Sequence, residues 1–310
     1  MSTLLFTHPI CLRHDTGEYH PECADRLKAV LAVLEGEEFS LLLREEAPIA
    51  TREQLLRAHL AEHVDHVFSV VPPPGEQYHI DPDTVLSSQS GDAALRSAGA
   101  VIAAVDAVAT GQVRNAFCAV RPPGHHAERD AAMGFCLFNN AAIGALHARD
   151  AHGCQRVAII DFDVHHGNGT QHILWDEPGM FYASTHQENA YPNTGLAEEK
   201  GGAGRMLNVP LPAGSGSDMF RQAFDDVILP KLRDFQPDFL LISAGFDAHA
   251  ADPMAHLRLK TSDFRWATER LLDVARDTAR NRVVSVLEGG YDINALAASV
   301  AEHVRALMGM

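Results

Sequence analysis

Short apolar segments that stop abruptly at polar residues recur along the whole chain. Each is a few residues long and rich in valine, isoleucine, leucine or phenylalanine. Runs of this kind are typical of strands buried on both faces of a parallel sheet, where no polar face interrupts the pattern. The pattern predicts strands at residues 3–7, 117–120, 157–160, 180–184, 207–210, 239–243 and 283–287.

Apolar residues at helical spacing separate most of these strands. A helix is predicted from Pro21 onward, because proline and the acidic residues Glu22 and Asp25 are typical of a first helical turn. Strands that alternate with helices favour an α/β fold, and the length fits one large domain or two small ones. Further helices are predicted at residues 54–66, 93–108, 140–148, 218–232 and 263–280.

The charge balance argues against two classes of partner. The chain has 25 Lys and Arg against 41 Asp and Glu, a net charge of −16, whereas nucleic acids and anionic membranes are bound through clustered cations. We find no apolar stretch long enough to span a membrane and no signal-peptide pattern, so a cytoplasmic protein is expected. The five cysteines form no Cys-x-x-Cys pair, which argues against a thiolate zinc site. The oligomeric state stays open, a homo-oligomer included.

The strand at residues 157–160 leads into the most unusual polar segment of the chain. Residues 161–170 are Asp-Phe-Asp-Val-His-His-Gly-Asn-Gly-Thr. Side chains alternate along an extended segment, so Asp161, Asp163 and His165 are predicted to share one side at the ligand-binding edge of the sheet. Carboxylate and imidazole form half of a transition-metal site. An Asp-x-Asp pair also occurs in magnesium-dependent phosphotransfer enzymes, and a histidine pair can cap a loop.

Other predicted strands end in related chemistry. His125 and His126 end the sequence Arg-Pro-Pro-Gly-His-His, which follows the strand at 117–120. Histidine titrates near neutral pH and is therefore suited to acid–base catalysis. The alternative is a surface pair of histidines in a rigid turn. Asp247 follows the strand at 239–243 and is a candidate third metal ligand. Tyr291 follows the last strand behind two glycines, a pattern that alone more often marks a turn. Parallel strands bring such segments to one edge of a sheet.

In this order the motifs resemble those of one enzyme superfamily. Residues 121–126, 161–171, 244–248 and 288–291, with His-Pro-Glu at residues 20–22, resemble the zinc-dependent histone deacetylases and acetylpolyamine amidohydrolases. The resemblance covers nearly the whole chain and looks closest to class II deacetylases and bacterial histone deacetylase-like amidohydrolases. It implies a single domain, residues 1–310, with the arginase/deacetylase-like fold: a roughly eight-stranded, mostly parallel sheet flanked by helices, with a narrow tunnel to the metal.

The resemblance also implies two metal sites. Asp163, His165 and Asp247 would bind one Zn²⁺ and leave a position for water and the substrate carbonyl; the donor set does not distinguish Zn²⁺ from Fe²⁺. A structural K⁺ would be held by Asp161, Ser184 and Thr185, with backbone carbonyls of Asp163 and His165.

The catalytic roles follow from the same resemblance. His126 would be the general base, whereas His125, paired with Asp161, would stay cationic and stabilise negative charge. Asn168, where several relatives have Asp, would leave His126 more easily neutral. Tyr291 would donate its hydroxyl to the developing oxyanion.

The substrate is expected to be an acetylated amine such as acetyl-lysine, bound in a tunnel that Gly134, Phe135 and Tyr191 would line. An acetylpolyamine or another small amide is the alternative. Deacetylases selective for acetylated polyamines carry an acidic gatekeeper where this chain has Met254, which argues against that choice. The sequence does not decide the acyl-chain preference.

Two rival functions are weaker. A binuclear manganese ureohydrolase needs further aspartates at the positions of Gly167 and His249. A catalytically silent acetyl-lysine binder would not need the complete set of ligands, histidines and tyrosine that this chain contains.

Overall fold

Eight parallel strands form the central sheet of this computed structural model, which describes residues 2–310. Their order across the sheet is β2-β1-β5-β10-β9-β6-β7-β8, and β3 and β4 form a separate antiparallel ribbon. The predicted α/β class with a roughly eight-stranded parallel sheet is confirmed. The strands are β1 (Thr3–Thr7), β2 (Leu43–Glu46), β3 (Tyr78–His79), β4 (Val85–Leu86), β5 (Asn115–Cys118), β6 (Val157–Asp161), β7 (Met180–Gln187), β8 (Met206–Leu211), β9 (Phe239–Ala244) and β10 (Val283–Leu287).

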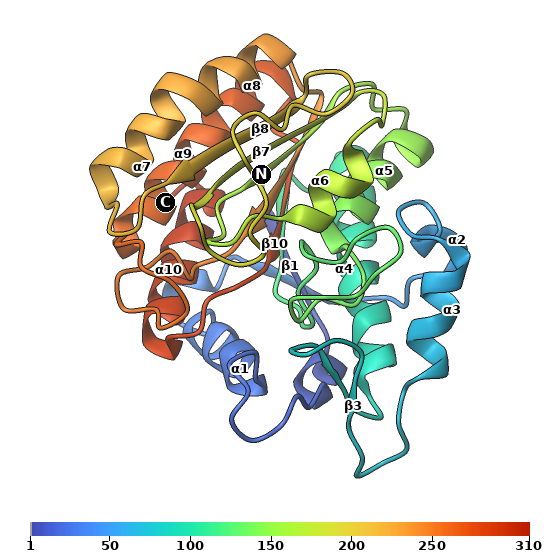
Figure 1. Cartoon of the computed structure of the whole chain (residues 1–310). Helices are drawn as coiled ribbons and strands as arrows, with labels where there is room; N and C mark the ends of the chain where they lie inside the picture. The colour runs from blue at the N-terminus through green and yellow to red at the C-terminus, as the bar shows by residue number, and fades with distance from the viewer. Residues whose placement is uncertain (1) are drawn as a thin grey trace.

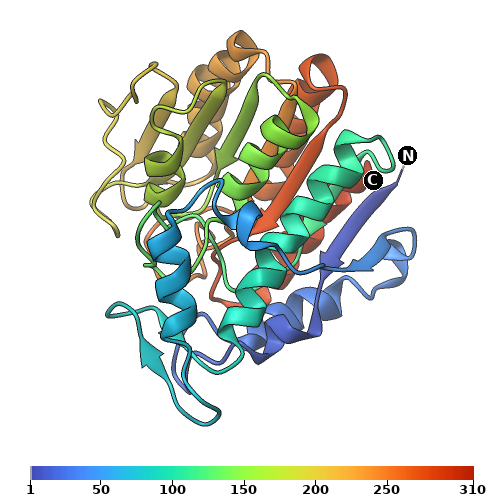
Figure 2. The same cartoon turned by 90° about the vertical axis from the view of Figure 1, so that its right-hand side faces the viewer.

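Helices cover both faces of the sheet. α4 and α5 pack on one face, and the helices from α7 to α10 lie on the other (Figures 1 and 2). No helix in residues 2–310 is long and apolar enough to cross a membrane. The helices are α1 (Ala24–Val33), α2 (Arg52–Leu55), α3 (Ala61–Ser69), α4 (Ser90–Ala109), α5 (Asn140–His152), α6 (Asn168–Leu174), α7 (Ser217–Ala223), α8 (Leu229–Phe235), α9 (Thr261–Thr278) and α10 (Ile293–Met308).

Three predicted helices differ from the structure. The helix predicted from Pro21 begins at Ala24, so Glu22 lies before its first turn, where it pairs with Arg26 and Arg121. The segment at 54–66 is split into α2 and α3, and α2 begins earlier because Thr51 caps it: the Thr51 hydroxyl accepts the N–H of Gln54 at 3.3 Å. The helix at 218–232 is interrupted by a π-helical turn, Phe224–Ile228, just before Pro230. Proline has no N–H to continue the α-helical bonds, which explains the break at this place.

The strand registers bring the polar segments to one edge. Asp161 at the end of β6 pairs with Ser184 of β7 on one side and Ser243 of β9 on the other. Leu287, the last residue of β10, pairs with Ala244, the last of β9. The loops after β6, β9 and β10 therefore start side by side, as predicted for the carboxyl edge of a parallel sheet.

Candidate active site

Tight turns, rather than strand alternation, group the polar side chains after β6. The strand ends at Asp161, and the Oδ1 atom of Asp161 accepts the N–H of Asp163 at 3.1 Å. Asp163 Oδ1 in turn accepts the N–H of His165 at 2.9 Å. In both cases an aspartate side chain accepts a hydrogen bond from the backbone N–H two residues later, as is common in turns. The prediction that an extended segment runs through His165 is therefore wrong, although Asp161, Asp163 and His165 do lie close together.

Asp163, His165 and Asp247 form a buried group, here called the three-ligand cluster. One ligand atom of each lies within 4.8 Å of the others. His165 Nδ1 is 3.1 Å from Asp163 Oδ1 and 3.2 Å from Asp247 Oδ2. Asp247 Oδ2 is buried and forms no hydrogen bond of good geometry within residues 2–310, despite that short distance. A buried carboxylate oxygen without a hydrogen bond is expected to have another partner, such as a cation.

Two glycines give the carboxylates of this cluster their room. A Cβ atom on Gly245 would lie 2.0 Å from Asp163 Oδ2, and one on Gly289 would lie 2.0 Å from Asp247 Oδ2. The N–H of Gly289 donates to Asp163 Oδ2 at 2.8 Å. Any larger residue at either position would displace a carboxylate, so the glycines after β9 and β10 shape the cluster.

The electrostatics of the cluster favour bound positive charge. Burial, reinforced by the neighbouring Asp163 carboxylate, raises the pKa of Asp247 to about 7. Burial opposes a charge on His165, but its two carboxylate neighbours raise its pKa to about 10. Imidazole nitrogen and carboxylate oxygen are both ligands of Zn²⁺, and three protein ligands are the number found at catalytic zinc sites, where a fourth position stays open. The residues of the cluster therefore fit a single divalent transition metal.

Two histidines with different surroundings lie beside the three-ligand cluster. Nδ1 of His125 is 3.0 Å from Asp161 Oδ2, whereas Nδ1 of His126 is 2.8 Å from Asn168 Oδ1. Burial lowers the pKa of His125, but the carboxylates of Asp163 and Asp161 outweigh it and raise that pKa well above 6.5. Burial and the nearby His125 hold the pKa of His126 well below 6.5. The pair thus combines one cationic and one neutral imidazole.

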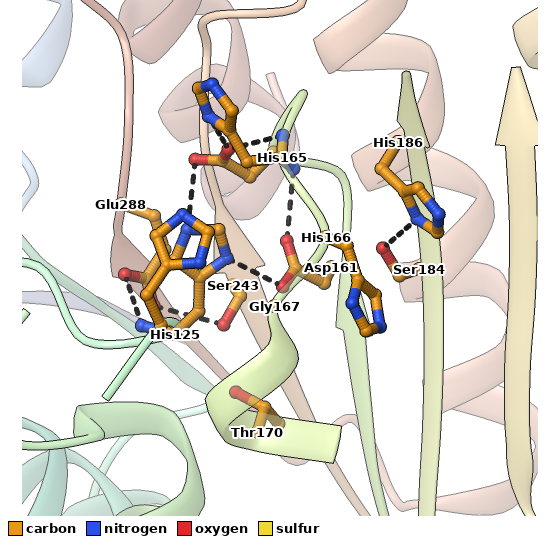
Figure 3. A network of polar contacts seen from close by, with 12 residues as sticks. His125, Asp161, His165, His166, Gly167, Thr170, Ser184, His186, Ser243 and Glu288 are labelled. Atoms are coloured by element: carbon orange, nitrogen blue, oxygen red, sulfur yellow. Dashed lines mark hydrogen bonds and ion pairs between the residues drawn. The ribbon is translucent and has the colours of Figure 1, made fainter. Parts of the chain in front are cut away.

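A buried glutamate holds the loop that carries the two histidines. Glu288 Oε2 accepts the N–H of Gly124 at 2.7 Å and of His125 at 3.2 Å, while Oε1 accepts the Ser243 hydroxyl at 3.1 Å (Figure 3). Glu288 was not among the site residues predicted from the sequence. The sequence does contain an indication of its role: Glu288 directly follows a buried strand, and a buried charged side chain needs polar partners in the fold.

Tyr291 lies on the loop between β10 and α10 and faces the same site. Burial, with the Asp247 and Asp163 carboxylates nearby, raises the pKa of its phenol well above 10, so the hydroxyl keeps its proton. The Arg26 guanidinium lies 4.8 Å from the centre of its ring. Its backbone N–H donates to Asp252 Oδ2 at 2.6 Å.

The predicted tunnel residues surround the histidines and Tyr291. The Tyr191 ring centre is 5.1 Å from that of His126, and the Phe135 ring centre is 5.9 Å from that of Tyr291. Gly134 has a φ of 56°, and a Cβ there would meet His126 Cδ2 at 2.5 Å. Met254 is partly exposed and bonded through its N–H to Asp252, the residue that also contacts the Tyr291 backbone.

The residues predicted to hold K⁺ lie next to the site. Ser184 pairs with Asp161 across β6 and β7, and its hydroxyl lies 2.9 Å from His186 Nδ1 (Figure 3). Asp161 Oδ2 also accepts the Tyr182 hydroxyl at 3.1 Å. Thr185 is buried. Asp161 and Ser184 are therefore neighbours across the two strands, Thr185 follows Ser184 in β7, and the K⁺ itself stays a prediction.

Comparison with known proteins decides the family. The histone deacetylase domain matches residues 20–307. The chain belongs to the histone deacetylase family. As a member, it is a hydrolase of the kind that deacetylates amides. The predicted relation to class II deacetylases and bacterial histone deacetylase-like amidohydrolases is confirmed.

Similar members of the histone deacetylase family come from plants and bacteria. Histone deacetylase 14, chloroplastic, of Arabidopsis thaliana is 37% identical over 326 residues, covering 99% of this chain and 77% of that protein. The histone deacetylase-like amidohydrolase of Pseudomonas aeruginosa is 42% identical over 275 residues, covering 87% and 71%. A crystal structure of the HDA15 HD domain matches with a TM-score of 0.92 and 36% identity, covering 100% of this chain and 89% of that one.

Proposed function

We propose that the protein is a zinc-dependent deacetylase that hydrolyses the amide of an acetylated amine such as acetyl-lysine. One observation carries the proposal: the three-ligand cluster lies beside two histidines of opposite protonation preference and a protonated tyrosine. The cluster would hold the metal that acts as a Lewis acid, His126 would be the base, His125 would stabilise charge, and Tyr291 would donate to the oxyanion. We propose that residues 1–310 act as one catalytic domain.

His126 is the general base in this proposal. Zn²⁺, when bound by Asp163, His165 and Asp247, lowers the pKa of a water ligand and polarises the amide carbonyl. His126 donates from Nδ1 to Asn168 Oδ1, so the lone pair of Nε2 is free to take the proton of the attacking water. The same nitrogen then delivers that proton to the amine nitrogen as the C–N bond breaks.

His125 and Tyr291 stabilise the negative charge that develops on the substrate. Asp161 keeps His125 protonated, which makes His125 a poor base but a fixed cation next to the reacting centre. The Tyr291 hydroxyl donates to the oxyanion, and its high pKa keeps the donor proton in place. Neither group needs to lose its proton during the reaction.

The substrate class is proposed from the tunnel walls. Phe135 and Tyr191, whose rings lie beside Tyr291 and His126, suit the apolar stem of a lysine side chain, and the exposed Met254 carries no charge to select a polyamine. An acetylpolyamine or another small amide is the alternative on the same site. Steady-state rates on acetyl-lysine peptides and on acetylated polyamines decide between them: a higher kcat/KM on the polyamines would overturn the lysine assignment.

The metal assignment has its own test. Asp163→Ala and His165→Ala each remove one of three protein ligands, so both variants should lose bound zinc and activity together. His66→Ala is the control, because His66 is exposed on α3 and belongs to none of the groups in residues 2–310 that could hold a metal. Metal analysis after loading with Zn²⁺ or Fe²⁺ measures occupancy; full occupancy in both ligand variants would contradict the assignment.

A further inference from the structure

The neutral side chain that contacts His126 has a charged partner of its own. Asn168 Nδ2 donates to Glu128 Oε1 at 2.7 Å, while Asn168 Oδ1 faces His126 Nδ1 at 2.8 Å. Asn168 is buried, and the Glu128 side chain is 30% exposed. Glu128 lies 40 residues from Asn168 in the chain but only two residues after His126.

The orientation of the Asn168 amide decides which nitrogen of His126 carries the proton. An amide has an acceptor end and a donor end, and a rotation by half a turn exchanges them. In the observed orientation the oxygen requires a proton on Nδ1, which leaves Nε2 of His126 free to accept one. In the reverse orientation the NH₂ group would donate to Nδ1, the proton would sit on Nε2, and His126 would be no base.

Glu128 provides the strongest preference between these orientations. With the amide reversed, Asn168 Oδ1 would face the Glu128 carboxylate, where two acceptors repel. The other neighbours of Nδ2 are weaker: the Met133 sulfur at 3.3 Å and the His126 carbonyl at 3.5 Å. A hydrogen bond to a charged group outweighs both.

The Glu128 side chain is not needed to shape its own loop. The loop is held by backbone bonds, since Glu128 N donates to the Ala131 carbonyl at 2.8 Å and the Glu128 carbonyl lies 2.8 Å from His59 Nδ1. The second carboxylate oxygen lies 3.1 Å from Nδ1 of the half-exposed His172, in a group that also includes the exposed Asp130. A substitution at Glu128 therefore spares the loop and removes the contact with Asn168.

We infer that Glu128 is a positioning residue that acts through Asn168 to keep His126 in the tautomer with a free Nε2. The inference rests on the proposed role of His126 as base. It makes a signed prediction for charge reversal: a lysine at position 128 would attract the Asn168 oxygen and so favour the reversed amide. Its effect should exceed that of simply removing the carboxylate.

The test compares Glu128→Ala, Glu128→Lys and the control Asp130→Ala, which removes an exposed carboxylate from the same loop. On zinc-loaded protein, with kcat taken from the pH-independent plateau, Glu128→Ala should lower kcat on the order of 10-fold with little change in KM. Glu128→Lys should lower it further, and Asp130→Ala should leave it unchanged. ¹⁵N NMR of labelled histidine should show the His126 proton moving from Nδ1 to Nε2 in the two Glu128 variants.

A second background separates positioning from a merely structural role. The carboxylate in Asn168→Asp has two equivalent oxygens and needs no orienting. In the Asn168→Asp background, Glu128→Lys should raise kcat instead of lowering it. The substitution removes the Glu128 carboxylate, which would repel the carboxylate introduced at position 168. An equal loss of kcat in both backgrounds, or an unchanged His126 tautomer, would overturn the inference. A wild-type protein inactive on every acetylated amine would overturn the proposed function, while the tautomer measurement would still report on Glu128.

Discussion

At the scale of single residues, the site gives two adjacent buried histidines opposite protonation preferences through the groups around each of them. His125 contacts a carboxylate and is held cationic, whereas His126 contacts a neutral amide and is held neutral. The difference lies in the charged neighbours rather than in burial, because both imidazoles are buried. The carboxylates of Asp163 and Asp161 raise the pKa of His125, whereas the nearby His125 lowers the pKa of His126. Perturbed groups of this kind are typical of functional sites.

The pH dependence should follow from this arrangement. Activity requires neutral His126, so the rate should rise as pH increases through the apparent pKa of the coupled site. Asn168→Asp places a carboxylate beside His126, which raises the pKa of His126 and should move the acidic limb of kcat/KM to higher pH. The profiles of wild type and Asn168→Asp measure the shift. His126→Ala should be more damaging than His125→Ala; the reverse order, or an unmoved limb, would refute the division of roles.

Tyr291 offers a cleaner single-atom test. Tyr291→Phe removes only the oxyanion donor, so the fold and the metal content should be retained while kcat falls by roughly 100-fold or more. Zinc analysis and thermal unfolding serve as controls for the variant. Wild-type turnover in Tyr291→Phe would remove this residue from the mechanism.

At the scale of elements, the sequence predicted most strands because their apolar runs are buried on both faces. The bounds of β10 match the predicted ones. β2 was missed because all four of its residues are exposed and give no apolar run. β7 runs past the predicted end because Thr185, His186 and Gln187 are polar yet buried, and a composition rule cannot see the partners that satisfy them.

The site residues that belong to local sequence motifs could be predicted, whereas those that act through contacts distant in the sequence could not. The three ligands, both histidines and Tyr291 follow strand ends, so the parallel sheet explains their convergence. Glu128 and Glu288 reach their partners across 40 and 164 residues. No local pattern encodes such distances, which is why these two contacts required the structure.

The loop between β10 and α10 is held in place by Asp252, which lies on the loop between β9 and α9. Asp252 Oδ2 accepts the N–H groups of Tyr291 at 2.6 Å and Asp292 at 3.2 Å, and Oδ1 accepts that of Met254 at 3.0 Å. Asp252→Ala removes all three bonds and should lower kcat on the order of 10-fold or more by misplacing the Tyr291 hydroxyl.

The controls for this prediction are metal content and a milder variant. Zinc occupancy should remain full in Asp252→Ala, since Asp252 is not part of the three-ligand cluster. Asp252→Asn keeps one acceptor oxygen and should lose less activity. If Asp252→Ala turned over at the wild-type rate, the loop would be held by other contacts.

At the scale of the whole molecule, buried neutral histidines should make the fold sensitive to acid. His303 is buried between Thr268 Oγ1, 2.6 Å from its Nδ1, and Ser285 Oγ, 2.9 Å from its Nε2. The Thr268 hydroxyl donates to the Phe264 carbonyl, so it accepts from Nδ1–H, and the serine can donate to Nε2. The neutral imidazole is thus fully bonded, and burial lowers the pKa of His303 to about 3.

The sign of the effect follows from proton binding. Between the unfolded pKa of roughly 6.5 and the folded value of about 3, the unfolded chain holds a proton on His303 that the folded protein does not. The free energy of unfolding should therefore fall as pH decreases through this window, by up to about 1.4 kcal/mol per pH unit for this residue. Urea unfolding from pH 7.5 to 5.0 measures the slope. His303→Gln should flatten it, and His79→Gln, on an exposed residue of β3, should not; equal slopes in wild type and His303→Gln would show that the folded protein protonates His303 as readily as the unfolded chain does.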